Sequence, residues 1–120
     1  MADVKIAYAA SATITIAPEN IATSSTFVAG VESAVIDNTT NKYVDALVGG
    51  TWTVGTTPTI NTQVLIYVFS VRDDAPTYPD VFDGTSSAET ITSAGVGSGF
   101  LKLAAVLSVV PTAQSAAVFC

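Results

Sequence analysis

Three β-branched residue types, Thr, Val and Ile, account for about a third of the 120 residues. Their side chains have few rotamers at χ1 and pack well on a pleated surface, so this composition favours strands over helices. Gly, Pro, Asn and Asp interrupt the chain about every ten residues, a spacing typical of β-sandwiches and barrels. The sequence therefore predicts an all-β fold.

Several segments carry the pattern of individual strands. Residues 12–16 alternate regularly and predict a half-buried strand with its threonines facing outward. Residues 27–36 are apolar on both faces apart from a short polar pair, with Gly30 as a candidate bulge. Residues 64–69 are six consecutive large apolar side chains, which predicts a central strand covered on both sides.

Turn signals separate these segments. Residues 37–41 combine Asp, Asn and Thr, whose short side chains hydrogen-bond to their own backbone, and they predict a turn. Gly49 and Gly50 lie between the apolar segments 43–48 and 51–54, which favours a hairpin.

The C-terminal part of the chain is predicted to supply the last strands. Residues 99–110 fit both a strand and a helical template, and the Val-Val-Pro ending favours the strand. Residues 113–120 predict a further strand. The whole pattern predicts one domain over residues 1–120, an antiparallel β-sandwich, jelly-roll-like, with seven to eight short strands.

Charged side chains are scarce and mostly acidic. Four Lys or Arg residues stand against ten Asp or Glu residues, for a net charge of −6. The basic residues are dispersed, whereas binding to phosphate backbones or anionic lipid surfaces requires them clustered. No stretch approaches the ~20 apolar residues of a membrane-spanning helix. We expect neither a nucleic-acid partner nor a membrane partner.

The residues that carry most catalytic chemistry are missing. The chain has no His and a single Cys, Cys120, so Ser-His-Asp triads, Cys-His pairs, His/Cys zinc sites and internal disulfides cannot be assembled. We expect no cofactor, no metal and no enzymatic activity. A two-carboxylate glycosidase, with Asp73 and Asp80 as the acid and the base, is the least favoured alternative.

The most polar stretch, residues 72–84, holds four of the ten acids and two prolines around a tyrosine. It predicts a long, semi-rigid surface loop available for a specific contact. The candidate interaction residues are Arg72, Asp73, Asp74, Tyr78, Asp80 and Asp83. A calcium loop is disfavoured, because an EF-hand register would place Pro79 and Val81 at ligand positions.

Aromatic residues offer a second kind of surface. Trp52, Tyr43, Tyr67 and Tyr78 are candidates for a sugar-binding platform, although a lone Trp on an alternating strand is more typical of a core.

Three stretches of the chain resemble a group of small tailed-bacteriophage proteins encoded among head and tail structural genes, mostly without an assigned activity. The stretches are residues 32–45, 55–59 and 77–84. The resemblance spans roughly residues 1–110 and rests on turns and strand edges. It implies a structural component of the virion, located in the particle, with capsid or tail subunits and further copies of itself as partners. Members of the group continue for several dozen residues more, so this chain is either a short form or a segment whose closing strands follow Cys120.

The charge-poor composition agrees with that implication, because large subunit interfaces are depleted in charged residues. The sequence thus predicts a capsid cement, decoration or head–tail connector-type protein that acts by adhesion between subunits. The alternative is a carbohydrate- or receptor-binding β-sandwich module of a phage tail or fibre.

Overall fold

The computed structural model describes residues 10–16, 21, 24–52, 59, 61–73, 75–92, 99–109 and 114–119. Within these residues the chain forms six strands, all paired antiparallel, and no helix. The strands are β1 (Ala29–Glu32), β2 (Leu47–Trp52), β3 (Gln63–Val68), β4 (Ser87–Thr90), β5 (Lys102–Ser108) and β6 (Gln114–Phe119). The all-β, antiparallel prediction is confirmed.

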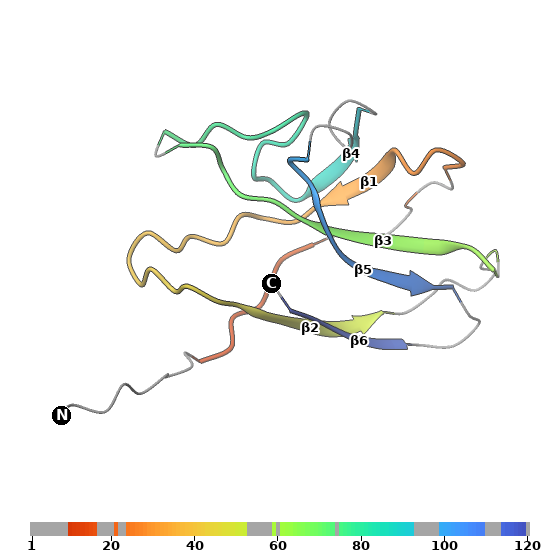
Figure 1. The fold of residues 1–120 in the computed structure, drawn as a ribbon, viewed down its shortest axis with the longest axis horizontal. Coiled ribbons are helices and arrows are strands. Elements are labelled where there is room, and N and C mark those ends of the chain that lie inside the picture. The colour runs from red at the N-terminus through yellow and green to blue at the C-terminus, as the bar shows by residue number, and fades with distance from the viewer. Residues whose placement is uncertain are drawn as a thin grey trace.

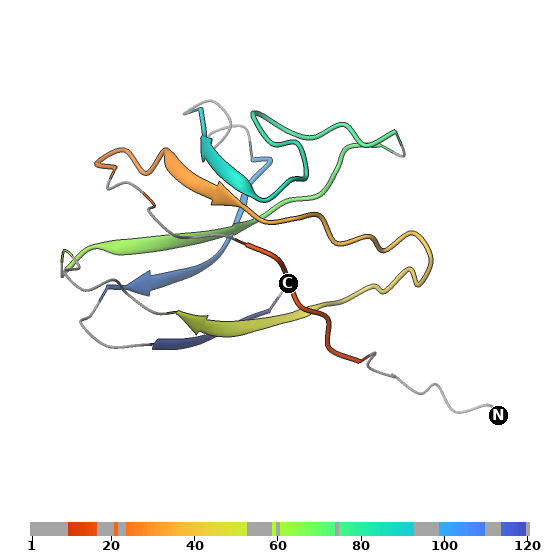
Figure 2. The same ribbon diagram turned by 180° about the vertical axis from the view of Figure 1, so that it is seen from behind.

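The strands form three two-stranded sheets, β1–β4, β2–β6 and β3–β5. In both ribbon views the β3–β5 pair lies between the other two (Figures 1 and 2). The sheets are linked where β5 and β6, consecutive in the chain, contact each other. Every pairing joins strands distant in sequence, so the long connections, rather than tight hairpins, determine which strands meet.

The later strand predictions are the most accurate. Residues 64–69 contain most of β3, and residues 99–110 contain β5, so the helical alternative there is wrong. The strand predicted over residues 113–120 is β6. The expected central position of β3 is wrong for the described part of the chain, because β5 is its only partner strand.

The hairpin predicted at Gly49 and Gly50 is also wrong. Both glycines lie inside β2, opposite residues 117 and 116 of β6. Neither has the positive φ that a two-residue hairpin turn requires. Two adjacent glycines here extend a strand instead of reversing it.

The bulge predicted at Gly30 is wrong, and the irregular ladder of the described chain is a different one. β1 pairs with β4 in unbroken register through Gly30. The irregularity lies in the β3–β5 ladder, where Ile66 is opposite Ala105 and Tyr67 is opposite Leu103, so Ala104 has no partner. Such an extra residue disrupts the ladder locally and increases its twist.

Residues 12–16 do not form the predicted strand. Ile16 makes an isolated antiparallel bridge with Ser33, and the carbonyl of Thr15 accepts a hydrogen bond from the Ala34 N–H at 2.8 Å. Residues 10–14 make no backbone hydrogen bond with any other described residue. Residues 12–16 have the alternating pattern of a strand, but within the described chain only Thr15 and Ile16 pair with another segment.

The turn predicted over residues 37–41 is confirmed, and Asn38 closes it. Its side chain accepts the Tyr43 N–H and donates to the Tyr43 carbonyl, both at 2.8 Å. The backbone carbonyl of Asn38 accepts the Lys42 N–H at 2.9 Å. The Asp37 carboxylate accepts the Thr39 N–H at 2.7 Å. These bonds hold the tip of the 33–46 segment, which runs out from β1 and returns to β2 (Figure 1).

Little of the described chain is buried. Among the residues whose burial is described, the buried apolar ones are Pro79 and the two residues that flank β5, Leu101 and Val109, with exposed fractions of 7% and 9%. Trp52, expected in the core, is half-buried. Thirteen large apolar side chains are exposed by more than a third. They are Ile16, Ile21, Phe27, Val35, Ile36, Tyr43, Val44, Leu47, Val71, Val81, Phe100, Leu103 and Val106.

Replacement of Leu101 by Ala should destabilise the fold much more than the same change at Leu103. Leu101 is 7% exposed and Leu103 is 49% exposed, so only the first deletion removes buried apolar contacts. We expect a loss of about 2–3 kcal/mol for Leu101→Ala and less than about 1 kcal/mol for Leu103→Ala, measured by urea unfolding. Equal losses would contradict this placement of the core.

The Asp37 turn should respond to acid. The backbone N–H of Thr39, and secondarily its side chain, lower the pKa of Asp37 below its ordinary value of 3.8. The stabilisation is therefore present above the unfolded-state pKa and is lost as the pH falls through the lower folded-state pKa. An NMR titration of the Asp37 carboxyl should show a midpoint below 3.8. Thr39→Val, which keeps the N–H, should retain most of the shift, and a wild-type midpoint at or above 3.8 would refute the assignment.

Candidate functional site

The loop predicted over residues 72–84 connects β3 to β4 without any strand or helix among its described residues. Its first half is a closed turn. The Asp73 carboxylate accepts the Thr77 N–H at 3.0 Å and the Thr77 hydroxyl at 2.8 Å. The Arg72 N–H donates to the Thr77 carbonyl at 2.9 Å.

The acids in the second half of the loop also bind neighbouring backbone. The Asp80 carboxylate accepts the N–H of Thr92 at 2.8 Å and its hydroxyl at 2.7 Å, so it joins the loop to the residues that follow β4. Asp83 accepts the Thr85 N–H at 2.8 Å. The three described acids of the loop are exposed, and each also accepts hydrogen bonds that hold the conformation of the loop.

Glu32, the last residue of β1, anchors the C-terminal end of the 72–84 loop. It is only 3% exposed, and its carboxylate accepts the N–H groups of Asp83 at 3.1 Å and Gly84 at 2.8 Å. The Gly84 carbonyl in turn accepts the Val35 N–H at 3.1 Å. A buried carboxylate is stable only when hydrogen-bonded, and here two backbone donors meet that need. Glu32 was not among the predicted site residues, although a single acid in the apolar segment 27–36 is the signal in the sequence that points to it.

Tyr78 packs over Gly84. Gly84 has φ +82°, and a side chain at this position would collide with the Tyr78 ring and hydroxyl. Glycine is therefore required on both conformational and steric grounds. Tyr78 is half-buried and Pro79 is buried, so the centre of the loop packs against the protein.

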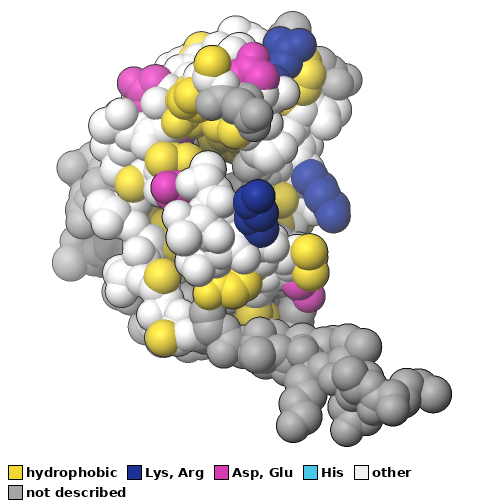
Figure 3. Space-filling model, turned by 90° about the vertical axis from the view of Figure 1, so that its left-hand side faces the viewer, with side chains coloured by type: hydrophobic (Ala, Val, Ile, Leu, Met, Phe, Trp, Pro, Cys, Tyr) yellow, Lys and Arg dark blue, Asp and Glu magenta, His cyan; other side chains and the backbone are white. Residues whose placement is uncertain are grey.

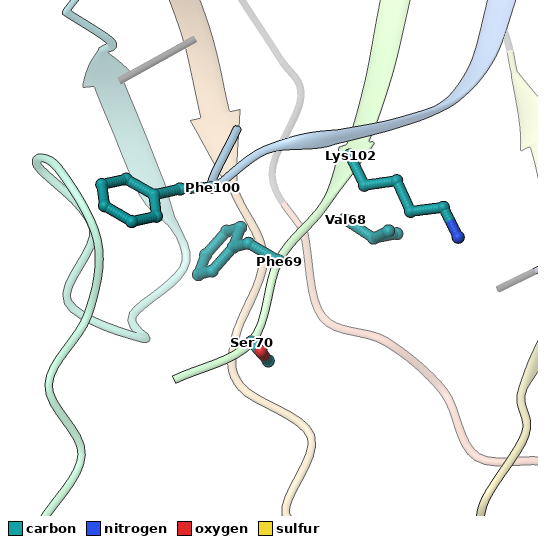
Figure 4. Close-up of a pocket in the computed structure, with 5 residues that line it drawn as sticks. All are labelled: Val68, Phe69, Ser70, Phe100 and Lys102. Carbon is teal, nitrogen blue, oxygen red and sulfur yellow. The ribbon is translucent and has the colours of Figure 1, made fainter. Parts of the chain in front are cut away.

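A shallow pocket of about 360 Å³ adjoins the loop, between the end of β3 and the start of β5 (Figure 4). It is lined by Val68, Phe69, Ser70, Phe100 and Lys102. The Lys102 side chain extends away from both phenyl rings in this view.

The loop contacts this pocket through two aromatic interactions. Phe69 stacks on Phe82 of the loop, with ring centroids 4.3 Å apart. The Arg72 guanidinium lies 5.3 Å from the centre of the Phe100 ring, within cation–π range. Two basic side chains, Arg72 and Lys102, thus flank an aromatic hollow.

The structure places five of the six predicted interaction residues in one ordered loop, and Asp74 lies outside the described residues. Tyr43, Trp52 and Tyr67 lie on other segments, and the only stacked ring pair in the described chain is Phe69 with Phe82. The aromatic platform stays a prediction. Among the described residues, no group of three His, Cys, Asp or Glu side chains is arranged to hold a metal ion.

The exposed apolar residues concentrate on the 33–46 segment and the start of β2. Val35, Ile36 and Tyr43 are each at least half exposed, and Val44 is fully exposed. Leu47 follows at 64%. On the face toward which this segment points, apolar side chains alternate with uncharged polar surface and with several separate acidic and basic groups (Figure 3).

Comparison of the chain with models of known protein families, with curated proteins and with solved structures finds no match. In the described part of the chain no helix is long and apolar enough to cross a membrane.

Glu32→Gln should release the end of the loop. The substituted amide keeps one acceptor oxygen but turns an NH₂ group toward a backbone N–H, so one of the two hydrogen bonds to Asp83 and Gly84 is lost. We expect a loss of about 1–3 kcal/mol and faster hydrogen exchange at these two amides.

Glu89→Gln is the matched control. Glu89 lies on β4, is half-buried and accepts a bond only from the Ser87 hydroxyl among the described residues. Exchange at Asp83 and Gly84 should be unchanged in this variant. Unchanged exchange in Glu32→Gln as well would show that the carboxylate does not anchor the loop.

Proposed function

We propose that this protein is a structural subunit that acts by adhesion to neighbouring subunits. The observation that carries the proposal is the distribution of apolar side chains: thirteen large ones are exposed and two are buried in the described chain. Exposed apolar side chains that lie together mark sites of protein contact, and Val35, Ile36, Tyr43, Val44 and Leu47 are exposed within one stretch of the chain.

The arrangement of strands supports the same role. Isolated two-stranded sheets are marginally stable in water and need further strands or a packed face. This chain has three of them, each with unpaired edges in the described residues. We propose that the assembled form completes a jelly-roll-like β-sandwich of seven to eight strands, in which neighbouring subunits cover the apolar faces.

The assembly we propose is a tailed-bacteriophage virion, with the protein as a capsid cement, decoration or head–tail connector-type component. The support is the resemblance of residues 32–45 and 77–84 to such proteins. These two stretches meet where Glu32 binds the backbone of Gly84, so the resembling residues form one local structure. Capsid or tail subunits and further copies of the chain are the proposed partners, and the role requires no catalytic residue.

A carbohydrate- or receptor-binding module is the second candidate. The pocket beside the loop favours it, because its lining combines the apolar rings of Phe69 and Phe100 with the polar side chains of Ser70 and Lys102. Aromatic side chains next to polar donors are typical of small-ligand sites.

Size-exclusion chromatography with light scattering tests the adhesion role. We expect the wild-type mass to be a multiple of 12.2 kDa. A double variant, Ile36→Asp with Val44→Asp, should weaken association about tenfold or more by placing charge in the apolar contact. Thr90→Asp, at an exposed position of β4, is the matched control and should associate as the wild type does.

A wild-type protein that stays monomeric and never copurifies with particles would overturn the proposal. Binding to a glycan array that is lost in Phe100→Ala would instead establish the second candidate.

A further inference from the structure

Residues 10–16, here called the arm, form a strand-like segment without a strand partner. Ala12, Ile14 and Ile16 alternate with Thr13 and Thr15, and none of the seven residues is charged. All are exposed except Ile14, which is half-buried. Only the bridge of Ile16 to Ser33 and the bond from Ala34 to Thr15 tie the arm to the described chain. The N–H and C=O groups of residues 10–14 are therefore available for another strand.

β2 offers an unpaired edge of matching length. Its six residues pair with β6 on one side in unbroken register and with no other strand of the described chain. Leu47, Gly49, Gly50 and Thr51 are exposed, and no atom lies within 4 Å of the place where a Cβ on Gly50 would stand. Natural edge strands are usually protected by charge, proline or a bulge, and β2 has none of these.

We propose that the arm of one copy adds as a third strand to the free edge of β2 in a second copy. This inference rests on the self-association in the proposed function and names the two segments that make it. The added strand would pair main-chain groups that are otherwise left to water, as in other cases of strand addition. Its apolar face, with Ile14 and Ile16, would extend the half-buried face that carries Val48 and Trp52.

The distribution of charge permits a second copy as the partner at this contact. Each copy carries a net charge of −6, so association through most of the surface would bring like charges together. The arm and β2 are both uncharged, and their contact avoids that repulsion. Every copy also presents both the strand and the edge, which permits a reciprocal pair or a head-to-tail series.

β3 is a less suitable acceptor than β2. Its residues from Val64 to Val68 are all half-buried, and its ladder with β5 shifts register at Ile66 and Tyr67. An irregular and partly covered strand accepts an additional strand less readily.

Two substitutions in the full chain test the inference from its two sides. Ile14→Pro removes an N–H that makes no backbone hydrogen bond within the described chain, so it should leave the single subunit folded and prevent strand pairing. Thr51→Lys places a charge on the proposed acceptor strand. We expect each to weaken self-association by about tenfold or more, measured by sedimentation at a series of dilutions.

Ile14→Val and Thr90→Lys are the matched controls. Valine keeps the β-branched side chain in the arm, and Thr90 is an equally exposed threonine on β4, which the arm is not expected to reach. Both should associate as the wild type does, and circular dichroism should show the same strand content in all four variants.

Crosslinking locates the contact directly. Copies with Thr13→Cys and copies with Thr51→Cys, both also carrying Cys120→Ser to remove the only native thiol, are mixed and treated with a short thiol crosslinker. A covalent heterodimer is expected, and a Thr90→Cys partner should give none. A wild type that associates while the variants have no effect and no heterodimer forms would refute the arm contact and leave the proposed function standing. A monomeric wild type would refute both.

Discussion

The buried carboxylate of Glu32 makes the contact on which the arrangement of the β1–β4 sheet and the 72–84 loop depends. It is placed by β1 and receives the backbone N–H groups of Asp83 and Gly84, more than fifty residues later in the chain. Through this contact the loop is fixed to the β1–β4 sheet. Asp80 adds a second tie to Thr92 beyond β4, so both ends of the sheet are held by carboxylates that accept backbone donors. In the described part of the chain, polar anchoring of this kind accompanies a small number of buried apolar side chains.

In contrast to these polar contacts, many large apolar side chains lie at the surface. Thirteen of the large ones are exposed, among them residues of the 33–46 segment and of β5, and most of the others are half-buried. A sequence with few charged residues and a small buried core is typical of a subunit whose folding is completed by its neighbours. The low charge also reduces repulsion between copies at the uncharged strands.

The sequence predicted individual strands better than their pairing. β3, β5 and β6 follow from apolar runs and β-branched residues, and the turn at Asn38 follows from side chains that bond to nearby backbone. The hairpin at Gly49 and Gly50 failed because a glycine pair permits a turn without requiring one. Residues 12–16 failed because a strand pattern specifies a half-buried strand and says nothing about whether its own chain supplies the partner. The polarity of residues 72–84 predicted a loop there, but the bond of Asp80 to Thr92 and the anchoring of the loop backbone by Glu32 were missed, because both join segments that meet only in the folded chain.

The sequence by itself determined the class of structure: an all-β chain without the residues for His- or Cys-based chemistry, poor in charge and divided by frequent turn residues. Those properties are local or compositional, and they act on each segment independently of the rest of the chain. The tertiary structure decided which strands pair, that Glu32 is buried beneath Gly84, and that Arg72 lies over Phe100. These contacts join residues far apart in sequence, and the free energy that selects among them comes from hydrogen bonding and burial that exist only once the segments meet.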